Sequence, residues 1–450
     1  MDAESTALVP PPGCPAHGTG ARIPLYGPEF AADPHAYYDY MRQFGATTPV
    51  ELAPGVEATL VTDHSAALQM LQDPTSFRKD ARRWRALKEG HIPADSPVLP
   101  LLAYRPNALF SDGVEHLRLR QAITDSLAKV DSRRLTQRTQ QISDYLIAQF
   151  GSRGSADLVG EYAKQLPLFV FTELFGCPAD IGDRILFGIS GMFDGINAGK
   201  AVEVLFQATA DLVALKRAKP GDDVASWLMK HEAGLSDEEM VYQLAVVIGP
   251  GAEPLRNLLG NTLHRLLTHD QYAHKGGLIS DALDDTLWGN PPLTNFLPHY
   301  AATDMEFAGT KLKAGDLVMV SIAAANNDRT LAAARQSGSN RAHLSFSAGP
   351  HACPSREPAR HITVTAIENL LNQLPDVELA VPSDSLTWRP GPFSRSLTAL
   401  PTRFTPVETV RGSAASKSRQ EAPAREEAQS SPRKVERTGL WSSFLSWLAK

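Results

Sequence analysis

The chain has 450 residues, of which 43% are hydrophobic, and carries a formal net charge of −6. This length and apolar content allow a large folded core, and an acidic balance without a dense Lys/Arg stripe excludes nucleic acid as a main partner. The three cysteines lie far apart and lack metal-site spacing, so we expect a reducing compartment and no disulfide framework.

Residues 1–22 are rich in Pro, Gly and Ala and are predicted to be flexible. They lack the basic and apolar regions of a secretory signal. No apolar run along the chain approaches the roughly 18 residues of a membrane span. The sequence therefore predicts a cytoplasmic protein.

Short strands and helices alternate in the first part of the chain. Apolar and polar residues alternate between Glu51 and Thr62, which indicates strands. A helical pattern follows from Val114 to about Lys129, where His116 and Arg120 are four residues apart and share one face. A solvated basic face is an equally good interpretation of that pair. From 135 to 228 helical periodicity dominates.

Ser236 and Glu239 have the spacing of a capping box, which predicts the start of a long helix. The helical pattern continues to about Thr268, and a helix of this length spans roughly 50 Å. Only the central helix of a large helical domain is that long. Its first half is apolar all round, which indicates burial.

Two prolines, Pro250 and Pro254, interrupt the middle of this predicted helix. An interior proline removes a ladder hydrogen bond at a cost of about 3 kcal/mol, so we expect the helix to open locally. The alternative is an ordinary kink, with the neighbouring Glu253 facing solvent.

The later part of the chain predicts a small sheet. Residues from His299 to Gly309 alternate like a hairpin, and the turn at 313–316 precedes a strand from Leu317 to Ile322.

Cys353 follows a Gly/Pro-rich loop that contains Phe346 and Gly349, and a helix is predicted from Pro358 to Leu371. A sulfur just before a helix lies near backbone N–H groups, which lower the thiol pKa and favour thiolate. Thiolate is a ligand for haem iron. The alternative is a small buried hydrophobic residue.

Phe346, Gly349, His351 and Cys353 keep the spacing of the haem-binding loop of the cytochrome P-450 family, which this chain resembles from Ile23 to about Phe404. The resemblance implies a haem domain over residues 23–408. The similarity is greatest to soluble actinobacterial members. It implies a mainly α fold with small β-sheets, built as a single large helical domain. It also implies haem (iron protoporphyrin IX) as cofactor, with Cys353 as the metal ligand.

The resemblance assigns roles to residues outside the loop. His116, Arg120, His299 and His351 correspond to positions that hold the haem propionates, and buried carboxylates do need cationic or donor partners. Segments around Trp84–Pro106 and Met192–Val204 and the residue Phe393 are implied to face the substrate. All three assignments rest on the resemblance alone.

On the long helix, Gly251, Ala252 and Glu253 match the family signature of glycine, any residue and an acid, which marks a groove for dioxygen. Pro254 replaces the threonine that follows in the family, so the hydroxyl that orders a water chain is missing. The resemblance leaves Glu253 as the surviving acid for proton delivery through water.

Two further departures concern the proximal side of the site. Ser355 replaces a glycine two residues after Cys353. Asp285 and Trp288 take the place of the family's Glu-x-x-Arg pair, so the arginine of the bidentate ion pair is absent. Actinobacterial members that lack Glu-x-x-Arg resemble this chain most closely.

The implied activity is that of a haem-thiolate monooxygenase or related oxidase acting on a small organic molecule with O2. Electrons would come from a ferredoxin and a ferredoxin reductase. The alternative is a catalytically weakened haem protein that serves as a component of a membrane-associated signalling assembly.

Residues 409–437 are polar and predict a disordered linker. Residues 438–450 predict an amphipathic helix with Trp and Leu on one face. Such a short helix is marginal in water unless it docks, so we expect it to bind a membrane surface or a protein partner, which would make the protein peripheral at the membrane. Folding back onto the chain's own surface is the alternative.

Overall fold

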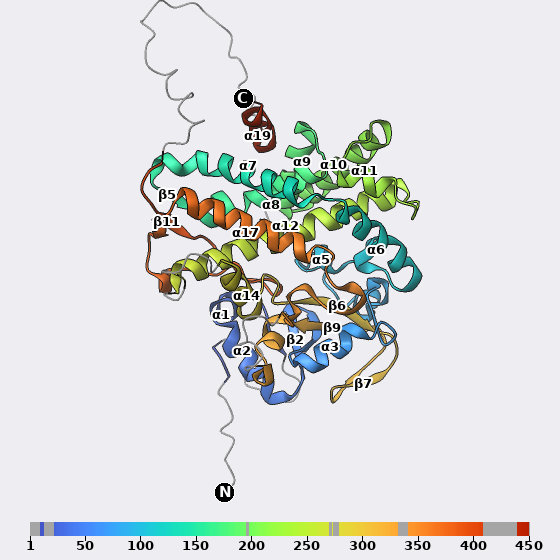
Figure 1. Ribbon diagram of the computed structural model, residues 1–450. Coiled ribbons are helices and arrows are strands. Elements are labelled where there is room, and N and C mark those ends of the chain that lie inside the picture. Colours follow the sequence, from blue (N-terminus) through green and yellow to red (C-terminus); the bar gives the residue numbers. More distant parts are fainter. Residues whose placement is uncertain are drawn as a thin grey trace, which may run out of the picture.

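The computed structural model describes residues 10–12, 22–194, 198–269, 272, 279–331, 341–407 and 439–449. It contains a sheet-bearing part, formed largely by the N-terminal segments and by residues 295–321, and a larger helical part (Figure 1). The predicted linker, residues 409–437, lies outside the described residues.

The helices have the following bounds: α1 (Pro28–Ala32), α2 (Pro34–Met41), α3 (His64–Gln72), α4 (Arg85–Lys88), α5 (Leu99–Leu102), α6 (Gly113–Ala128), α7 (Ser132–Phe150), α8 (Gln165–Leu174), α9 (Ala179–Asp194), α10 (Ala198–Ala218), α11 (Val224–Met229), α12 (Asp237–Thr268), α14 (Ile279–Gly289), α15 (Ile322–Asn326), α17 (Arg356–Gln373) and α19 (Leu440–Leu448). Short helical turns that matter for the site are η3 (Ala108–Phe110), η7 (Leu344–Phe346) and η8 (Gly349–His351).

The strands are β1 (Ile23–Pro24), β2 (Thr47–Ala53), β3 (Val56–Val61), β4 (Phe77–Arg78), β5 (Ser155–Asp157), β6 (Asn295–Ala301), β7 (Met305–Phe307), β8 (Thr310–Leu312), β9 (Leu317–Ser321), β10 (Glu378–Leu379) and β11 (Pro401–Arg403). Six of them form one sheet in the order β1-β2-β3-β9-β6-β4. Strand β9 pairs with β3 in parallel and with β6 antiparallel, so segments more than 230 residues apart in the chain become neighbours.

Helix α12 runs through the helical part for 32 residues, as the sequence predicts. Its capping box is formed in both directions: the Ser236 side chain accepts from the N–H of Glu239, and the Glu239 side chain accepts from the N–H of Ser236. The helix continues without interruption through Pro250 and Pro254. The expected local break is therefore wrong, because packing on several sides holds the helix together where the prolines remove ladder donors.

The C-terminal helix α19 packs on the outer surface of the helical part, against α7 and α9 (Figure 1). Trp441 and Phe444 are each only 1% exposed, and both rings contact Phe169 of α8. The Trp441 indole N–H donates to the carbonyl of Cys177 at 3.1 Å, and its backbone N–H donates to Asp183 at 2.6 Å.

This docking corrects the prediction that residues 438–450 bind a membrane or a partner protein. The apolar face of α19 is already buried against its own chain, so it is not free for an external target. Gly182 makes the contact possible, because a Cβ at that position would lie 2.2 Å from a Trp441 ring carbon. Within the described residues, no helix has both the length and the apolar character to cross a bilayer.

Candidate active site

The Cys353 loop is held by its own backbone and by a close approach to α3. The Cys353 N–H donates to the Phe346 carbonyl at 2.8 Å, and the Ala352 N–H donates to the Gly349 carbonyl at 3.1 Å. Gly349 has φ +68°, and a Cβ there would lie 2.1 Å from the carbonyl oxygen of Leu71. Glycine is therefore required at 349 by both conformation and space.

The sulfur of Cys353 lies three residues before α17. The backbone N–H of Ser355 hydrogen-bonds the sulfur, so serine at this position still supplies the donor. Burial nevertheless raises the pKa of the thiol, and Ser355 and Arg120 only oppose that shift. The predicted net lowering of the thiol pKa is wrong for the protein without a metal, whereas coordination to a cation would deprotonate the thiol outright. The residue as a whole is exposed, although enough protein surrounds the sulfur to raise the thiol pKa.

His116, Arg120, His299 and His351 come together beside this loop, as predicted. The rings of His116 and His351 lie 3.7 Å apart, centroid to centroid. Arg120 donates to the carbonyl of Ala352, next to Cys353. His299 comes from β6, and its Nδ1 lies 2.8 Å from the Leu297 carbonyl, which leaves Nε2 available on the other side of the ring.

Lys79 is a fifth basic residue in this group, and sequence reasoning missed it. It follows β4 directly, is 3% exposed, and donates from Nζ to the Pro298 carbonyl at 2.7 Å. Its charge contributes to lowering the pKa values of His116, His299 and His351. Within the chain it is one of several basic residues between 78 and 85, and no sequence signal distinguishes it from the others.

Burial lowers the pKa of every group in this basic cluster, defined as Lys79, His116, Arg120, His299 and His351. Burial lowers the pKa of Lys79 to about 7. None of the five forms an ion pair with a carboxylate among the described residues, and the nearby Asp112 is hydrogen-bonded to the N–H groups of Lys79 and Asp80.

Buried basic side chains that form no ion pair are suited to an anion from outside the chain, because a bound anion would stabilise their protonated forms. His116 Nε2 has no hydrogen-bond partner in the described part of the protein, although it is buried. A haem carries two carboxylates and an iron that accepts a thiolate ligand. The residues present therefore fit haem: Cys353 for the iron, and the basic cluster for the propionates. Together they define a haem-thiolate protein.

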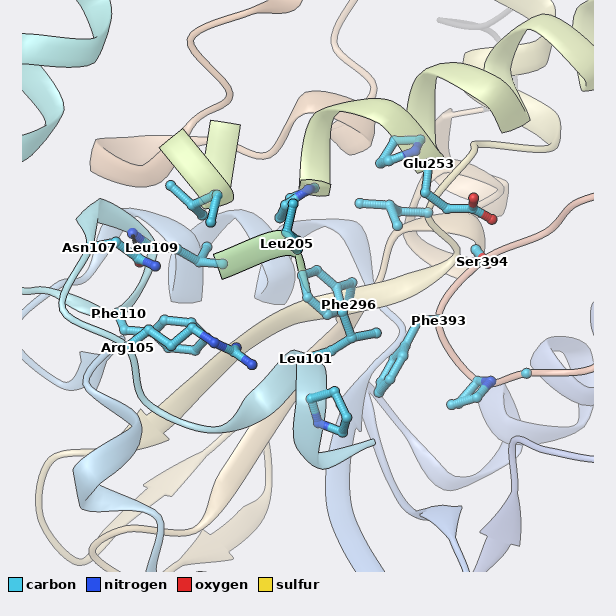
Figure 2. A pocket seen from close by; sticks show the side chains of 18 of the residues that line it. Leu101, Arg105, Asn107, Leu109, Phe110, Leu205, Glu253, Phe296, Phe393 and Ser394 are labelled. Carbon is cyan, nitrogen blue, oxygen red and sulfur yellow. Dashed lines mark hydrogen bonds between the residues drawn. The ribbon is translucent and has the colours of Figure 1, made fainter. Parts of the chain in front are cut away.

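A cavity of about 230 Å³ lies along one face of α12 (Figure 2). This face presents Tyr242, Val246, Pro250, Glu253 and Pro254. Residues from the other walls are mostly apolar: Pro100, Leu101, Leu109, Phe110, Leu205, Phe206, Leu293, Phe296 and Phe393.

The predicted residues of α12 divide between two sides of the helix. Pro254 and Glu253 line the cavity. Gly251 instead faces α8, where a Cβ would lie 2.8 Å from the ring of Phe171, and Ala252 is 3% exposed and absent from the cavity wall. Gly251 therefore allows close helix packing.

Glu253 is the one acidic residue among those that line the cavity. Its carboxylate lies 2.8 Å from Arg389 and 3.3 Å from Arg256. Glu253 is 8% exposed, and this pairing supplies the counter-charges that a buried carboxylate requires. It does not face solvent, so that alternative is excluded.

The expected substrate-facing segments and the residues that line the cavity agree only in part. Pro100, Leu101, Arg105 and Phe393 line the cavity. Trp84 instead is 1% exposed in the core beside Tyr300. The segment Met192–Val204 lies partly outside the described residues. Helix α10 begins within it, and the next two residues of that helix, Leu205 and Phe206, line the cavity.

The ion pair behind the loop uses Asp284 and not Asp285. Arg360 of α17 binds the Asp284 carboxylate, and Arg341 lies 3.7 Å from it. Asp285 meets the Tyr272 hydroxyl and lies 4.0 Å from Arg265. Arg360 lies on the helix that follows Cys353, so Asp284 connects α14 to the proximal loop without an arginine on its own helix.

Individual proteins of known class are similar to this chain, although no protein-family model matches it. The cytochrome P450 monooxygenase PikC of Streptomyces venezuelae is 30% identical over 413 residues, which cover 86% of this chain and 96% of that protein. The vitamin D(3) 25-hydroxylase of Pseudonocardia autotrophica is 30% identical over 400 residues, covering 85% and 96%. The chain therefore belongs to the cytochrome P450 family.

Solved structures agree with this assignment. CYP154C4 from Streptomyces sp. W2061 superposes with a TM-score of 0.76 at 28% identity and covers 85% of this chain and 97% of that one. CxnD, a cytochrome P450 for C–S bond formation in chuangxinmycin biosynthesis, superposes with a TM-score of 0.75 at 27% identity. The predicted family and the mainly helical fold with small sheets are confirmed, and the protein is a haem-dependent oxidoreductase.

Proposed function

We propose that the protein is a monooxygenase that oxidises a small organic molecule bound in the cavity along α12, with electrons from a ferredoxin and its reductase. The observation that supports it best is the combination of an accessible Cys353, the basic cluster and a mostly apolar cavity on α12. The alternative of a signalling component acting through its C-terminal helix loses its main support, because α19 is docked.

Each part of the chain has a defined task in this proposal. Cys353 binds the iron, and the basic cluster holds the two propionates. When bound, a thiolate-ligated haem supplies oxygen activation at the expense of two electrons. The apolar walls exclude water around the substrate, which limits side reactions.

Proton supply is assigned to Glu253. The carboxylate lines the cavity but is held by Arg256 and Arg389, so it can pass a proton only through a water that reaches it between these partners. Pro254 offers neither a hydroxyl nor an N–H to order such a water. We therefore expect proton transfer to be slow and part of the electron flow to yield peroxide or water.

The test uses the purified full-length protein loaded with haem. We expect the reduced, carbon-monoxide-bound protein to show the thiolate-type absorption band, and Cys353→Ala to lose that band together with tight haem binding. Cys177→Ala is the matched control, because Cys177 is buried beside α19, remote from the loop in sequence, and should leave the band unchanged. An unaltered spectrum in Cys353→Ala would refute the ligand assignment.

A further inference from the structure

Polar groups occur at two places in the otherwise apolar cavity. One is Glu253 with Arg389, where the carboxylate pairs with both Arg389 and Arg256. The other consists of Arg105, Asn107 and Tyr242, and no carboxylate belongs to it. In Figure 2, Arg105 extends among the apolar side chains on the side opposite Glu253.

Arg105 differs from Arg389 in having no partner. Within the described part of the chain, its guanidinium forms no hydrogen bond and no ion pair. Burial lowers its pKa, and only the electrostatic effect of Tyr242 opposes the shift. A half-buried guanidinium without an acceptor is costly unless a ligand supplies one.

Asn107 adds a second donor of defined orientation. Its Oδ1 accepts from the Leu109 N–H at 3.0 Å, which fixes the amide so that Nδ2 is the group left to donate. The residue is 2% exposed and lines the cavity, and no acceptor for Nδ2 lies among the described residues.

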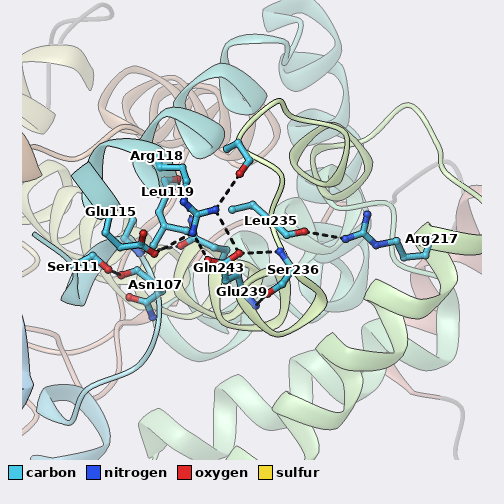
Figure 3. A network of polar contacts seen from close by, with 12 residues as sticks. Asn107, Ser111, Glu115, Arg118, Leu119, Arg217, Leu235, Ser236, Glu239 and Gln243 are labelled. Atoms are coloured by element: carbon cyan, nitrogen blue, oxygen red, sulfur yellow. Dashed lines mark hydrogen bonds and ion pairs between the residues drawn. The ribbon is translucent and has the colours of Figure 1, made fainter. Parts of the chain in front are cut away.

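The backbone that carries both residues is fixed to α12. The buried Gln243 accepts from the Ala108 N–H at 3.0 Å and donates to the Leu119 carbonyl at 3.0 Å (Figure 3). The Ser111 hydroxyl donates to the Asn107 carbonyl at 2.7 Å. The donors at 105 and 107 are therefore presented by a braced segment, and the ordering cost of binding is small.

The cavity is elongated along α12. Tyr242 lines the cavity on this helix and acts electrostatically on Arg105, and it precedes Pro254 by 12 residues, which corresponds to about 18 Å along the helix. Val246 and Pro250 line the distance between them. One end thus offers unpaired donors, and the other end offers an apolar wall near the paired Glu253.

We propose that the cavity binds an elongated amphipathic organic acid, with its carboxylate on Arg105 and the Nδ2 of Asn107 and its apolar chain directed along α12 toward Pro254. This inference rests on the proposed function, because the bound acid is the substrate. It also predicts that the carbons presented beside Pro250 and Pro254 are those remote from the carboxylate.

The experiment measures binding by calorimetry to the haem-loaded full-length protein. The probes are dodecanoate and 1-dodecanol, which share a chain and differ in the head group. We expect dodecanoate to bind about tenfold or more tightly than the alcohol, because a charge-assisted pair in an apolar site is strong. Arg105→Gln should remove this preference, and Arg105→Lys should restore part of it.

Arg153→Gln is the matched control, since Arg153 is half exposed and paired with Glu161, away from the cavity. It should bind both probes as the wild type does. Equal affinity of the wild type for the two probes, or an unchanged preference in Arg105→Gln, would overturn the proposal. Preference for dodecanoate through Arg105 in a protein without the carbon-monoxide band would support the acid site and refute the proposed monooxygenase.

Discussion

At the scale of single residues, the site is defined by charges that the chain itself does not balance. Most arginines near the site have a carboxylate or carbonyl partner, as Arg360 and Arg389 do. The basic cluster and Arg105 form no ion pair with a carboxylate among the described residues: Lys79 and Arg120 donate to backbone carbonyls, and the Arg105 guanidinium has neither kind of partner. An uncompensated buried cation costs stability, so its presence indicates a bound anion.

The first prediction concerns Lys79 in the haem-free protein. Its pKa is about 7 in the folded chain and roughly 10.4 when unfolded. Between these values the unfolded state holds more protons, so the Lys79 contribution makes the free energy of unfolding rise with pH, by at most about 1.4 kcal/mol per pH unit. Below pH 7 both states are protonated and the slope vanishes.

Denaturant titrations of the haem-free protein at pH 7, 8 and 9 check this, with Lys79→Met for comparison. The substitution should remove the rise. Identical pH slopes in both proteins would mean that folding does not lower the pKa of Lys79.

At the scale of elements, two contacts between segments distant in the chain determine where helices pack, which the sequences of those helices do not predict. Helix α19 covers α7, α8 and α9, and the Asp284–Arg360 pair joins α14 to α17. Helix α9 in turn packs along α10, which supplies Leu205 and Phe206 to the cavity wall. The C-terminal helix therefore stabilises the helices that border the cavity.

The second prediction concerns Trp441. Trp441→Ala should destabilise the protein by about 3–5 kcal/mol, or by the whole docking energy of α19 if that is smaller, because the helix can undock. The matched control is Leu440→Ala, since Leu440 is 55% exposed and should change little. Equal melting temperatures for the two variants would contradict the docked position of α19.

The third prediction concerns Asp284. Asp284→Asn leaves the buried Arg360, whose side chain is 8% exposed, without its counter-charge, so a loss of about 3–5 kcal/mol is expected. Asp285→Asn is the control, because the Asp285 side chain is 48% exposed. Chemical denaturation compares the free energies of unfolding of the two variants. A larger loss of stability in Asp285→Asn would show that Asp284 is not the acid on which the ion pair depends.

At the scale of the whole molecule, the proposed haem site draws on both parts of the fold. Cys353, His116 and Arg120 belong to α17, α6 and their adjoining loops, whereas Lys79 and His299 come from the sheet-bearing part. A ligand that contacts both parts stabilises their association by mass action.

The fourth prediction follows from this arrangement. Removing haem should raise hydrogen exchange in the Cys353 loop, the start of α6 and the segment after β4, because these are the places where the basic cluster loses its anions. Exchange in α19, on the outer surface, should stay the same. Hydrogen-exchange mass spectrometry of the two forms measures this, and a uniform change across the chain would contradict a localised effect.

Local sequence patterns predicted the capped central helix and the cysteine loop, whereas resemblance to the family pointed to the family itself and to four members of the basic cluster. The helix cap and the cysteine loop depend on residues close together in the chain, Ser236 with Glu239 and Phe346 with Cys353, so chain geometry alone carries them. Only the tertiary structure decided the rest: Lys79 in the cluster, Asp284 as the paired acid, Glu253 between two arginines, and α19 on its own chain. Each depends on partners that are distant in sequence or not marked by any local pattern, and burial and charge balance become defined only once the chain has folded.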